Sequence, residues 1–352
     1  MKKVFWGIFL ILLIVAAYFV FSLYRFPSQP FGPQAIIEVK KGMGIQSLVN
    51  EIYNAKLTNH PKLLDYYFRY KGVASVLKVG EYEFGPGATP EQILQKLLKG
   101  ERLRRSFTIP EGFSVRDIAK SLGEKGVVNP DLFLQKALAN NAAPRYGLEG
   151  SSLEGYLFPD TYEYTKEMKE DQILQMMVNN FKKKVDQKLM NIPSQLGLSK
   201  YQALTLASIV EKETGKAEER PLISGVFYNR LRTNMPLATD PTIIYGIPNF
   251  DGNIHKSDLE RDGPYNTYLH PGLPPTPISN PGLKSIEAVL NPATTDYLYF
   301  VSKGDGSHQF SRTVEEHNAA VQMYQLNRGA SSQPSSQPSS QPAISTSQPA
   351  HL

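Results

Sequence analysis

An uncharged apolar stretch at the N-terminus limits what this chain can fold into more than any other feature. It runs from Val4 to Tyr24 and reads VFWGIFLILLIVAAYFVFSLY. At about 1.5 Å of rise per residue, a helix of this length crosses the roughly 30 Å hydrocarbon core of a bilayer. A cleaved signal peptide is the alternative, but bulky residues follow the small pair Ala16-Ala17, where cleavage needs small ones. The pattern therefore favours an uncleaved membrane anchor over residues 1–25.

The charges beside this stretch predict its orientation. Lys2, Lys3 and the terminal amine precede it, whereas Arg25 alone follows it. The positive-inside rule places the more basic flank in the cytoplasm. We therefore expect a single-pass protein of the inner (cytoplasmic) membrane, with a cytoplasmic N-terminus and everything after the anchor in the periplasm or outside the cell.

Composition excludes several classes of site and partner. The chain has 352 residues and 41% hydrophobic content, which suggests two domains plus appendages at roughly 100–200 residues per domain. It has no cysteine, so disulfides, thiolate metal sites and cysteine nucleophiles are ruled out. A net charge of +5, spread without a basic block, predicts no nucleic-acid partner. The histidines lack metal-ligand spacing and no H-E-x-x-H occurs, so we expect no metal and no organic cofactor.

One short pattern occurs three times between residues 35 and 127. A glycine is followed six and ten residues later by apolar side chains, as expected for a turn and an amphipathic helix, and a short extended run precedes each glycine. The three sets are Gly42 with Leu48 and Ile52, Gly87 with Ile93 and Leu97, and Gly112 with Ile118 and Leu122. Such α/β units suit a binding module, although a purely structural spacer has the same pattern.

The rest of the chain has a different texture. After a linker at 26–34 and the repeated units, residues 128–328 predict a mixed α+β domain with helices near 130–138, 170–190 and 199–213. A stretch rich in Pro, Gly and Asn from 235 to 292 is too long for an idle connection, so chemistry is expected there. The Ser/Gln/Pro repeats of 329–352 predict a disordered tail.

Two glutamates end the helix that leads into this stretch. Glu211 and Glu213 lie about 200° apart on the helical wheel, so they cannot both point into one cleft. Periodicity does not choose between them, and both could be solvated carboxylates of a last helical turn.

Six long motifs carry a resemblance to a known family, and this resemblance distinguishes Glu213 from Glu211. In chain order they are LEGYLFPDTYEY, LASIVEKET, ERPLISGVFYNRL, MPLATDPTIIYG, YNTYLHPGLPPTPISNPG and ATTDYLYFVSKGDGSHQFS. Together the chain resembles the MltG (YceG-like) family of membrane-anchored endolytic murein transglycosylases over residues 36–325. The resemblance implies that the repeated units form a LysM-like glycan-binding region, that Glu213 is the catalyst and that Glu211 is surface or support.

The resemblance also implies the reaction and the partners. A raised-pKa carboxyl would protonate the oxygen between N-acetylmuramic acid and N-acetylglucosamine, and the sugar's own 6-hydroxyl would then attack, giving a 1,6-anhydro end. The substrate would be nascent peptidoglycan glycan strands, whose elongation the cut would terminate, and the peptidoglycan synthases are possible partners. No second carboxylate is needed, unlike in most glycosidases.

Other polar residues are candidates for the remaining roles. A muramidase that hydrolyses the same bond would need a second carboxylate from Glu154, Asp160 or Asp240, although Asp240 before Pro241 could be only a helix N-cap. A non-catalytic wall-binding scaffold is the other alternative. The residues expected to bind substrate are Glu154, Asn229, Arg230, Asp240, Tyr265, Asn266, Thr267 and Tyr268.

Overall fold

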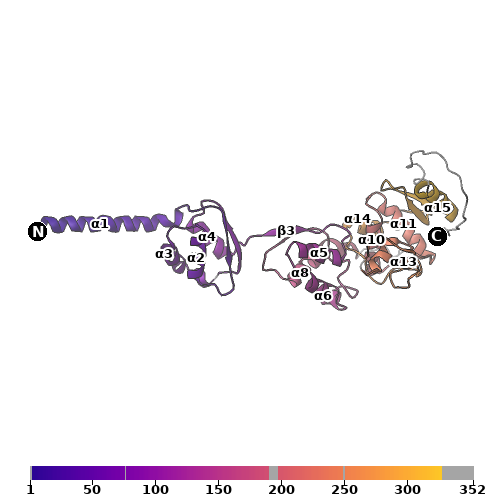
Figure 1. Cartoon of the computed structure of the whole chain (residues 1–352), viewed down its shortest axis with the longest axis horizontal. Coiled ribbons are helices and arrows are strands. Elements are labelled where there is room, and N and C mark those ends of the chain that lie inside the picture. Colours follow the sequence, from indigo (N-terminus) through magenta and orange to yellow (C-terminus); the bar gives the residue numbers. More distant parts are fainter. Residues whose placement is uncertain (1, 76, 190–196, 249, 327–352) are drawn as a thin grey trace, which may run out of the picture. The chain divides into compact units, whose positions relative to one another are not determined.

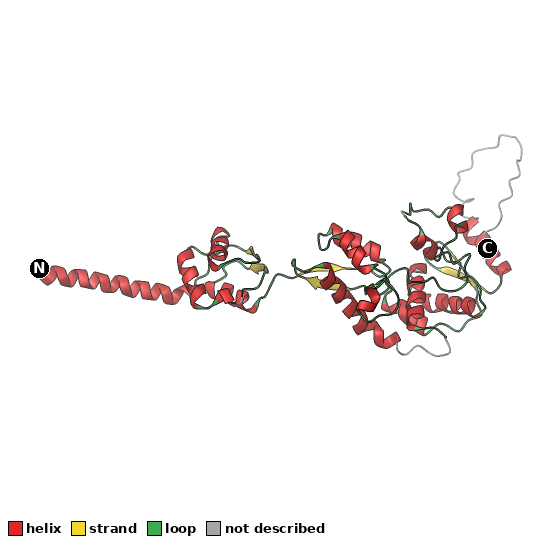
Figure 2. Ribbon diagram, turned by 90° about the horizontal axis from the view of Figure 1, so that it is seen from below, coloured by secondary structure: helices red, strands yellow, loops and turns green. Residues whose placement is uncertain are grey.

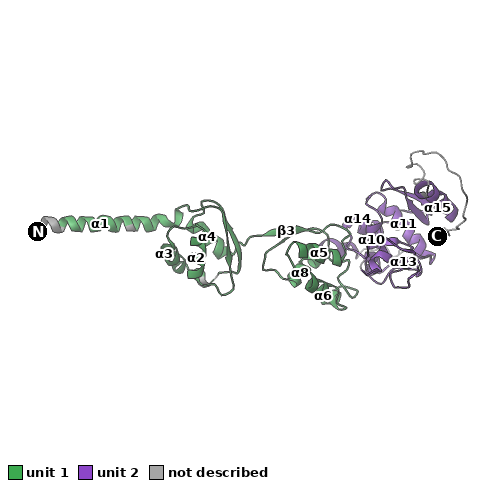
Figure 3. Cartoon of the chain, in the orientation of Figure 1, with its two compact units in different colours: residues 1–182 green, residues 183–352 purple. Residues whose placement is uncertain are grey.

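A computed structural model describes residues 2–75, 77–189, 197–248 and 250–326, and the tail expected at 329–352 lies outside them. The chain divides into two compact units, Met1–Lys182 and Lys183–Leu352 (Figure 3). Helices dominate both units, and the strands are short (Figure 2). The expected mixed α+β class is confirmed, and each described strand belongs to an antiparallel pair.

The apolar N-terminal stretch is one continuous helix, α1 (Lys2–Arg25). The candidate span Trp6–Ser28 contains an 18-residue window with a mean hydropathy of 2.5, and none of that window is buried inside the protein. By length and composition this helix can cross a membrane, as the sequence predicts.

The first module of unit 1 follows α1 directly. Its elements are η1 (Phe26–Ser28), β1 (Ala35–Val39), α2 (Ile45–Asn54), α3 (Pro61–Tyr70), η2 (Val73–Ser75), β2 (Gly80–Phe84) and α4 (Pro90–Lys99) (Figure 1). β1 and β2 pair antiparallel, and one apolar core lies between the strands and helices. Phe26 belongs to that core and Phe31 bridges to Ala88, so residues 26–34, expected as a linker, pack onto the first module.

The second module of unit 1 has a core of its own. Its elements are β3 (Arg105–Thr108), α5 (Val115–Glu124), α6 (Pro130–Ala137), α7 (Ala142–Arg145), β4 (Thr161–Tyr164) and α8 (Glu170–Phe181). β3 pairs with β4, and α5 packs against α6. The third repeated unit therefore folds with residues after 128, and the boundary expected at 127/128 cuts through this module. β3 and β4 are more than about 50 residues apart in the sequence. A pairing over that distance cannot be read from the short pattern of one strand-turn-helix unit.

The repeated pattern itself is confirmed as strand, turn and helix. Gly42, Gly87 and Gly112 have φ values of 80°, 73° and 77°, a left-handed conformation in which a side chain is strained. Thr89 and Ser114 begin α4 and α5 with capping boxes, each accepting a backbone N–H three residues later.

Unit 2 is built around one buried helix. Its elements are α9 (Gln187–Leu189), α10 (Lys200–Glu213), α11 (Arg220–Arg232), α12 (Asp240–Gly246), α13 (Lys256–Glu260), α14 (Leu283–Leu290), β5 (Tyr299–Ser302), β6 (His308–Ser311), α15 (Val314–Val321) and η5 (Gln322–Leu326), after η3 (Lys182–Asp186) at the junction. α10 packs against α11, α12 and α14. In its described residues, 235–248 and 250–292, this stretch contains α12, α13 and α14, and its Pro and Gly content concealed the last two.

Candidate active site

The two glutamates of interest lie in the last turn of α10. Ser199 starts this helix with a capping box to Gln202, and the next turns are buried from Ala203 to Val210. The helix stops at Glu213 because Thr214 is extended, with φ −144°. Burial on nearly all sides fixes the position of α10, so its last turn presents the two carboxylates in defined directions.

Both carboxylate oxygens of Glu211 accept hydrogen bonds from neighbouring helices. Its Oε1 accepts a hydrogen bond from Arg220 Nη2 at 3.1 Å, and its Oε2 accepts from Gly282 N at 3.0 Å and Ser285 Oγ at 2.7 Å. The Glu211 and Arg220 side chains are only 5% and 9% exposed. Gly282 is the N-cap of α14, so this carboxylate joins α10, α11 and the start of α14.

Glu213 has a contrasting environment. Its Oε1 accepts a hydrogen bond from the Thr239 hydroxyl. Burial raises the pKa of Glu213 to about 7, and the nearby Asp240 adds to the rise, while the Thr239 hydrogen bond and the Arg230 charge oppose it. A carboxyl with this pKa exchanges a proton readily near neutral pH, as an acid-base catalyst must.

A network of hydroxyl groups holds Thr239 in place. Thr239 N donates to Thr267 Oγ1 at 3.2 Å, and Ala238 N donates to Thr267 O at 2.9 Å. The Thr242 and Thr267 hydroxyls lie 2.8 Å apart, and all three threonines are buried. Thr267, which we expect to bind substrate, also positions the residue that contacts Glu213.

Three of the predicted site residues, Arg230, Asp240 and Tyr268, lie close enough to Glu213 to interact with its charge. Arg230 Nε and Nη1 donate to Leu298 O and Leu237 O, both at 2.6 Å, which fixes its cation near the carboxylate. Tyr268 Oη donates to Asp240 Oδ1 at 2.6 Å, and burial raises the pKa of this phenol. The expected N-cap role of Asp240 is wrong by one position, since Asp240 begins α12 and Thr239 is its N-cap.

Three other candidates are committed to backbone groups. Glu154 is fully buried in unit 1 and accepts from Val115 N at the start of α5, at 3.0 Å and 3.2 Å from its two oxygens. Asn229 Nδ2 donates to Thr295 O and Tyr297 O, and Asn266 Nδ2 donates to Leu259 O and Arg261 O. Each of these buried polar groups holds a helix start or a loop, and the binding roles expected for Glu154, Asn229 and Asn266 stay predictions.

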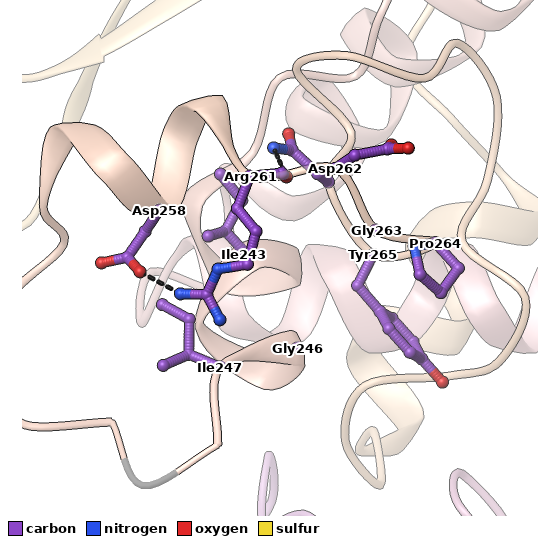
Figure 4. Close-up of a pocket in the computed structure, with 10 residues that line it drawn as sticks. Ile243, Gly246, Ile247, Asp258, Arg261, Asp262, Gly263, Pro264 and Tyr265 are labelled. Atoms are coloured by element: carbon purple, nitrogen blue, oxygen red, sulfur yellow. Dashed lines mark hydrogen bonds and ion pairs between the residues drawn. The ribbon is translucent and has the colours of Figure 1, made fainter.

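Tyr265 lines a hollow at the far end of α12 from Glu213. Gly246 and Ile247 line the same hollow, as do Asp258 and Arg261, which form an ion pair (Figure 4). A Cβ at Gly246 would lie only 3.1 Å from the Tyr265 Cβ. The absence of a side chain at Gly246 therefore lets the end of α12 approach Tyr265 closely. The Tyr265 ring thus remains a candidate surface for a sugar.

Comparisons with known proteins identify the group to which this architecture belongs. Residues 37–323 match the model of the YceG-like family. The chain belongs to the YceG-like family. The resemblance that the motifs indicated is therefore confirmed.

Three similar proteins support this membership. An endolytic murein transglycosylase of Bacillus subtilis is 32% identical over 306 residues, which cover 82% of this chain and 84% of that protein. One from Streptococcus pneumoniae serotype 2 is 31% identical over 317 residues, and the match spans only 57% of its length. The crystal structure of a yceG-like protein from Listeria monocytogenes has a TM-score of 0.56 at 32% identity, and the match covers 82% of this chain and 99% of that one.

Thr239 is the site residue of this YceG-like chain that sequence reasoning missed. It lies within the quoted motif MPLATDPTIIYG, but an uncharged residue gave no signal beside Asp240. Its contact with Glu213 depends on the fold bringing α12 to the end of α10.

We expect Thr239→Val to alter the pH dependence of any reaction that uses Glu213. A hydrogen bond to a charged group contributes about 1.5–3 kcal/mol, so its loss should raise the Glu213 pKa and shift the alkaline limb of kcat/KM upward by about one pH unit. Thr242→Val is the matched control, because this buried hydroxyl bonds Thr239 O and Thr267 but not Glu213. An unshifted limb in Thr239→Val would contradict the role given to this hydrogen bond.

Proposed function

We propose that this YceG-like protein is an endolytic murein transglycosylase that cuts the β-1,4 bond between N-acetylmuramic acid and N-acetylglucosamine within nascent glycan strands. The relatives from B. subtilis and S. pneumoniae carry that activity in their names. The observation that carries the proposal for this chain is the raised pKa of Glu213, at about 7, beside a hydroxyl donor. The other glutamate of the same helical turn is occupied by Arg220 and α14.

The first step of the proposed reaction uses the protonated form of Glu213. Its carboxyl donates a proton to the oxygen that links the two sugars, and the bond from that oxygen to the anomeric carbon of the muramic acid breaks. The Thr239 hydroxyl stabilises the carboxylate that remains, and Arg230 adds a fixed positive charge. Positive charge on the sugar is then greatest at its anomeric carbon.

The second step uses the carboxylate just formed. It accepts the proton of the muramic acid 6-hydroxyl as that oxygen bonds to the anomeric carbon, which closes the 1,6-anhydro ring. Glu213 is protonated again, so one residue completes the cycle and no water is consumed. We propose that Tyr268, Asp240 and Tyr265 contact the strand next to this centre.

A muramidase reading is weakened by the position of Glu154. Hydrolysis needs a second carboxylate to activate water, and Glu154 is fully buried against backbone. Asp240 is the remaining candidate near Glu213, and it accepts the Tyr268 hydroxyl. Analysis of the reaction product distinguishes the two enzymes.

The catalytic rate should decrease with rising pH through the Glu213 pKa. Because the first step needs the protonated acid, kcat/KM is expected to be constant at mildly acidic pH and to fall about tenfold per pH unit above about 7. Measurement on purified glycan strands between pH 5 and 9, with a melting curve at each pH, tests this. A rate that rises through the same range would assign Glu213 the role of a base that must start ionised.

We propose that α1 anchors the enzyme in the inner membrane with its N-terminus in the cytoplasm, and that the first module is the LysM-like part that binds glycan. Strands leaving the synthases would then be cut near the bilayer, which terminates their elongation. A short tether to the membrane gives a high effective concentration of enzyme for such strands. The synthases are the partners that this placement favours.

Deletion of residues 1–25 is expected to remove the membrane location of the protein and to leave its catalytic activity. The shortened protein keeps Phe26 and should be soluble, fold and cut isolated strands, because α1 contains no site residue. It should no longer act on wall synthesis in cells. Turnover of purified strands by this fragment would also exclude the wall-binding scaffold, whereas a folded fragment without turnover would contradict the enzymatic proposal.

A further inference from the structure

The first residue after α1 lies in the core of the first module. Phe26 follows Arg25 directly, and only 2% of its surface is exposed. Its ring centroid lies 6.3 Å from that of Phe31, 6.4 Å from that of His60 and 6.2 Å from that of Tyr67. If α1 spans the bilayer, the side of the module that holds Phe26 must therefore lie at the membrane surface.

The helix that contacts Phe26 is α3. His60 is the N-cap residue of α3 and Tyr67 lies within the helix. Two of the three rings next to Phe26 therefore come from α3. On the face turned away from the buried core residues Leu64 and Phe68, α3 carries large aromatic side chains. Tyr66 and Tyr70 are 65% and 75% exposed.

Cationic side chains accompany these rings. The Lys71 ammonium lies 5.9 Å from the Tyr67 ring centroid and 6.0 Å from that of Tyr70. Lys62 is exposed on the first turn of α3, and Arg25 ends α1. Tyrosines with an apolar body and a polar tip are enriched at the level of lipid headgroups, and Lys and Arg are attracted to anionic lipids there.

We propose that the outward face of α3, formed by Lys62, Tyr66 and Tyr70, lies in the headgroup region of the bilayer that α1 enters, with Lys71 beside it at the end of the helix. This inference rests on the proposed anchoring by α1 and adds a second, peripheral contact. The occupant of the face is a lipid surface with anionic headgroups, continuous with the membrane around α1. The first module is thereby fixed on the bilayer surface.

Tryptophan fluorescence of the full-length protein tests this contact. The chain has one tryptophan, Trp6, which lies within α1. Two variants move the probe to α3, Trp6→Phe with Tyr66→Trp and Trp6→Phe with Tyr70→Trp. The matched control is Trp6→Phe with Ile36→Trp, since Ile36 is 50% exposed in the same module but on β1. Each is placed in vesicles of phosphatidylglycerol and phosphatidylethanolamine with brominated acyl chains, and melting curves verify the fold.

The proposal expects bromine quenching of the wild-type Trp6 and of both α3 probes, with the β1 probe unquenched. Quenching of Trp6 without quenching at positions 66 and 70 would overturn the α3 contact and leave the anchor intact. Unquenched Trp6 would overturn the anchor and this inference with it. Equal quenching of the β1 probe would overturn the assignment to α3. Glycan strands that shield positions 66 and 70 from aqueous iodide, without lipid quenching, would make this a glycan-binding face instead.

Discussion

Replacing Glu213 by Gln is expected to abolish cleavage and to stabilise the protein at the same time. The amide keeps the shape and can still accept the Thr239 hydrogen bond, but it can neither donate nor accept the catalytic proton. General acid-base catalysis contributes about 10²–10⁴-fold per step, and Glu213 serves in both steps, so we expect turnover to fall by at least about 10³-fold.

The stability change has a definite pH dependence. The folded-state pKa of Glu213 is raised from 4.5 to about 7, so ionising this group opposes folding. That cost is absent below the ordinary pKa and is fully present above the raised one. Glu213→Gln should therefore be more stable than wild type by about 1–3 kcal/mol at pH 8 and equally stable at pH 4. Urea unfolding at both pH values measures this, and a variant that is destabilised at pH 8 would contradict the environment assigned to Glu213.

Replacing Glu211 is expected to have the opposite result. Glu211→Ala leaves the Arg220 guanidinium without its carboxylate partner and removes the acceptor of Gly282 N and Ser285 Oγ. Loss of one partner of a buried ion pair destabilises a protein by about 3–5 kcal/mol. The protein that remains folded should still cleave glycan, because no step of the reaction uses this group.

Glu287→Ala is the matched control for that experiment. This glutamate is also in unit 2 and pairs with Lys188, but the two side chains are 38% and 41% exposed. Exposed ion pairs contribute about 0–1 kcal/mol, so little change is expected. A Glu211→Ala protein as stable as Glu287→Ala would contradict the structural role, and a stable but inactive one would place the catalyst at Glu211.

The contrast between Glu211 and Glu213 marks the limit of sequence reasoning. The helix that holds them was predicted almost to its ends, because a buried apolar run with a Ser N-cap leaves a strong local pattern. The wheel indicated that the two carboxylates diverge, but not which neighbours they meet. Arg220 is close in sequence, whereas Gly282, Ser285 and Thr239 reach them only through the tertiary fold.

The same limit explains the errors at other positions. The glycine turns and apolar spacing correctly predicted the three strand-turn-helix units. They did not predict that β3 pairs with β4, which places the third unit in the second module. Glu154 was a candidate second carboxylate, and Asn266 an amide partner for a sugar rich in N-acetyl and hydroxyl groups. Their bonds to Val115 N and to the Leu259 and Arg261 carbonyls depend on burial, which residue type alone does not predict.

The chemical form of the new strand end tests the central proposal most directly. The fragment lacking residues 1–25 is incubated with purified glycan strands in water enriched in heavy oxygen, and the products are analysed by mass spectrometry. A lytic transglycosylase leaves 1,6-anhydro ends that contain no oxygen from water, and this is the result we predict, with Glu213→Gln giving no new ends. Reducing ends that carry the heavy isotope would show that water attacks the sugar, and would contradict the proposed mechanism.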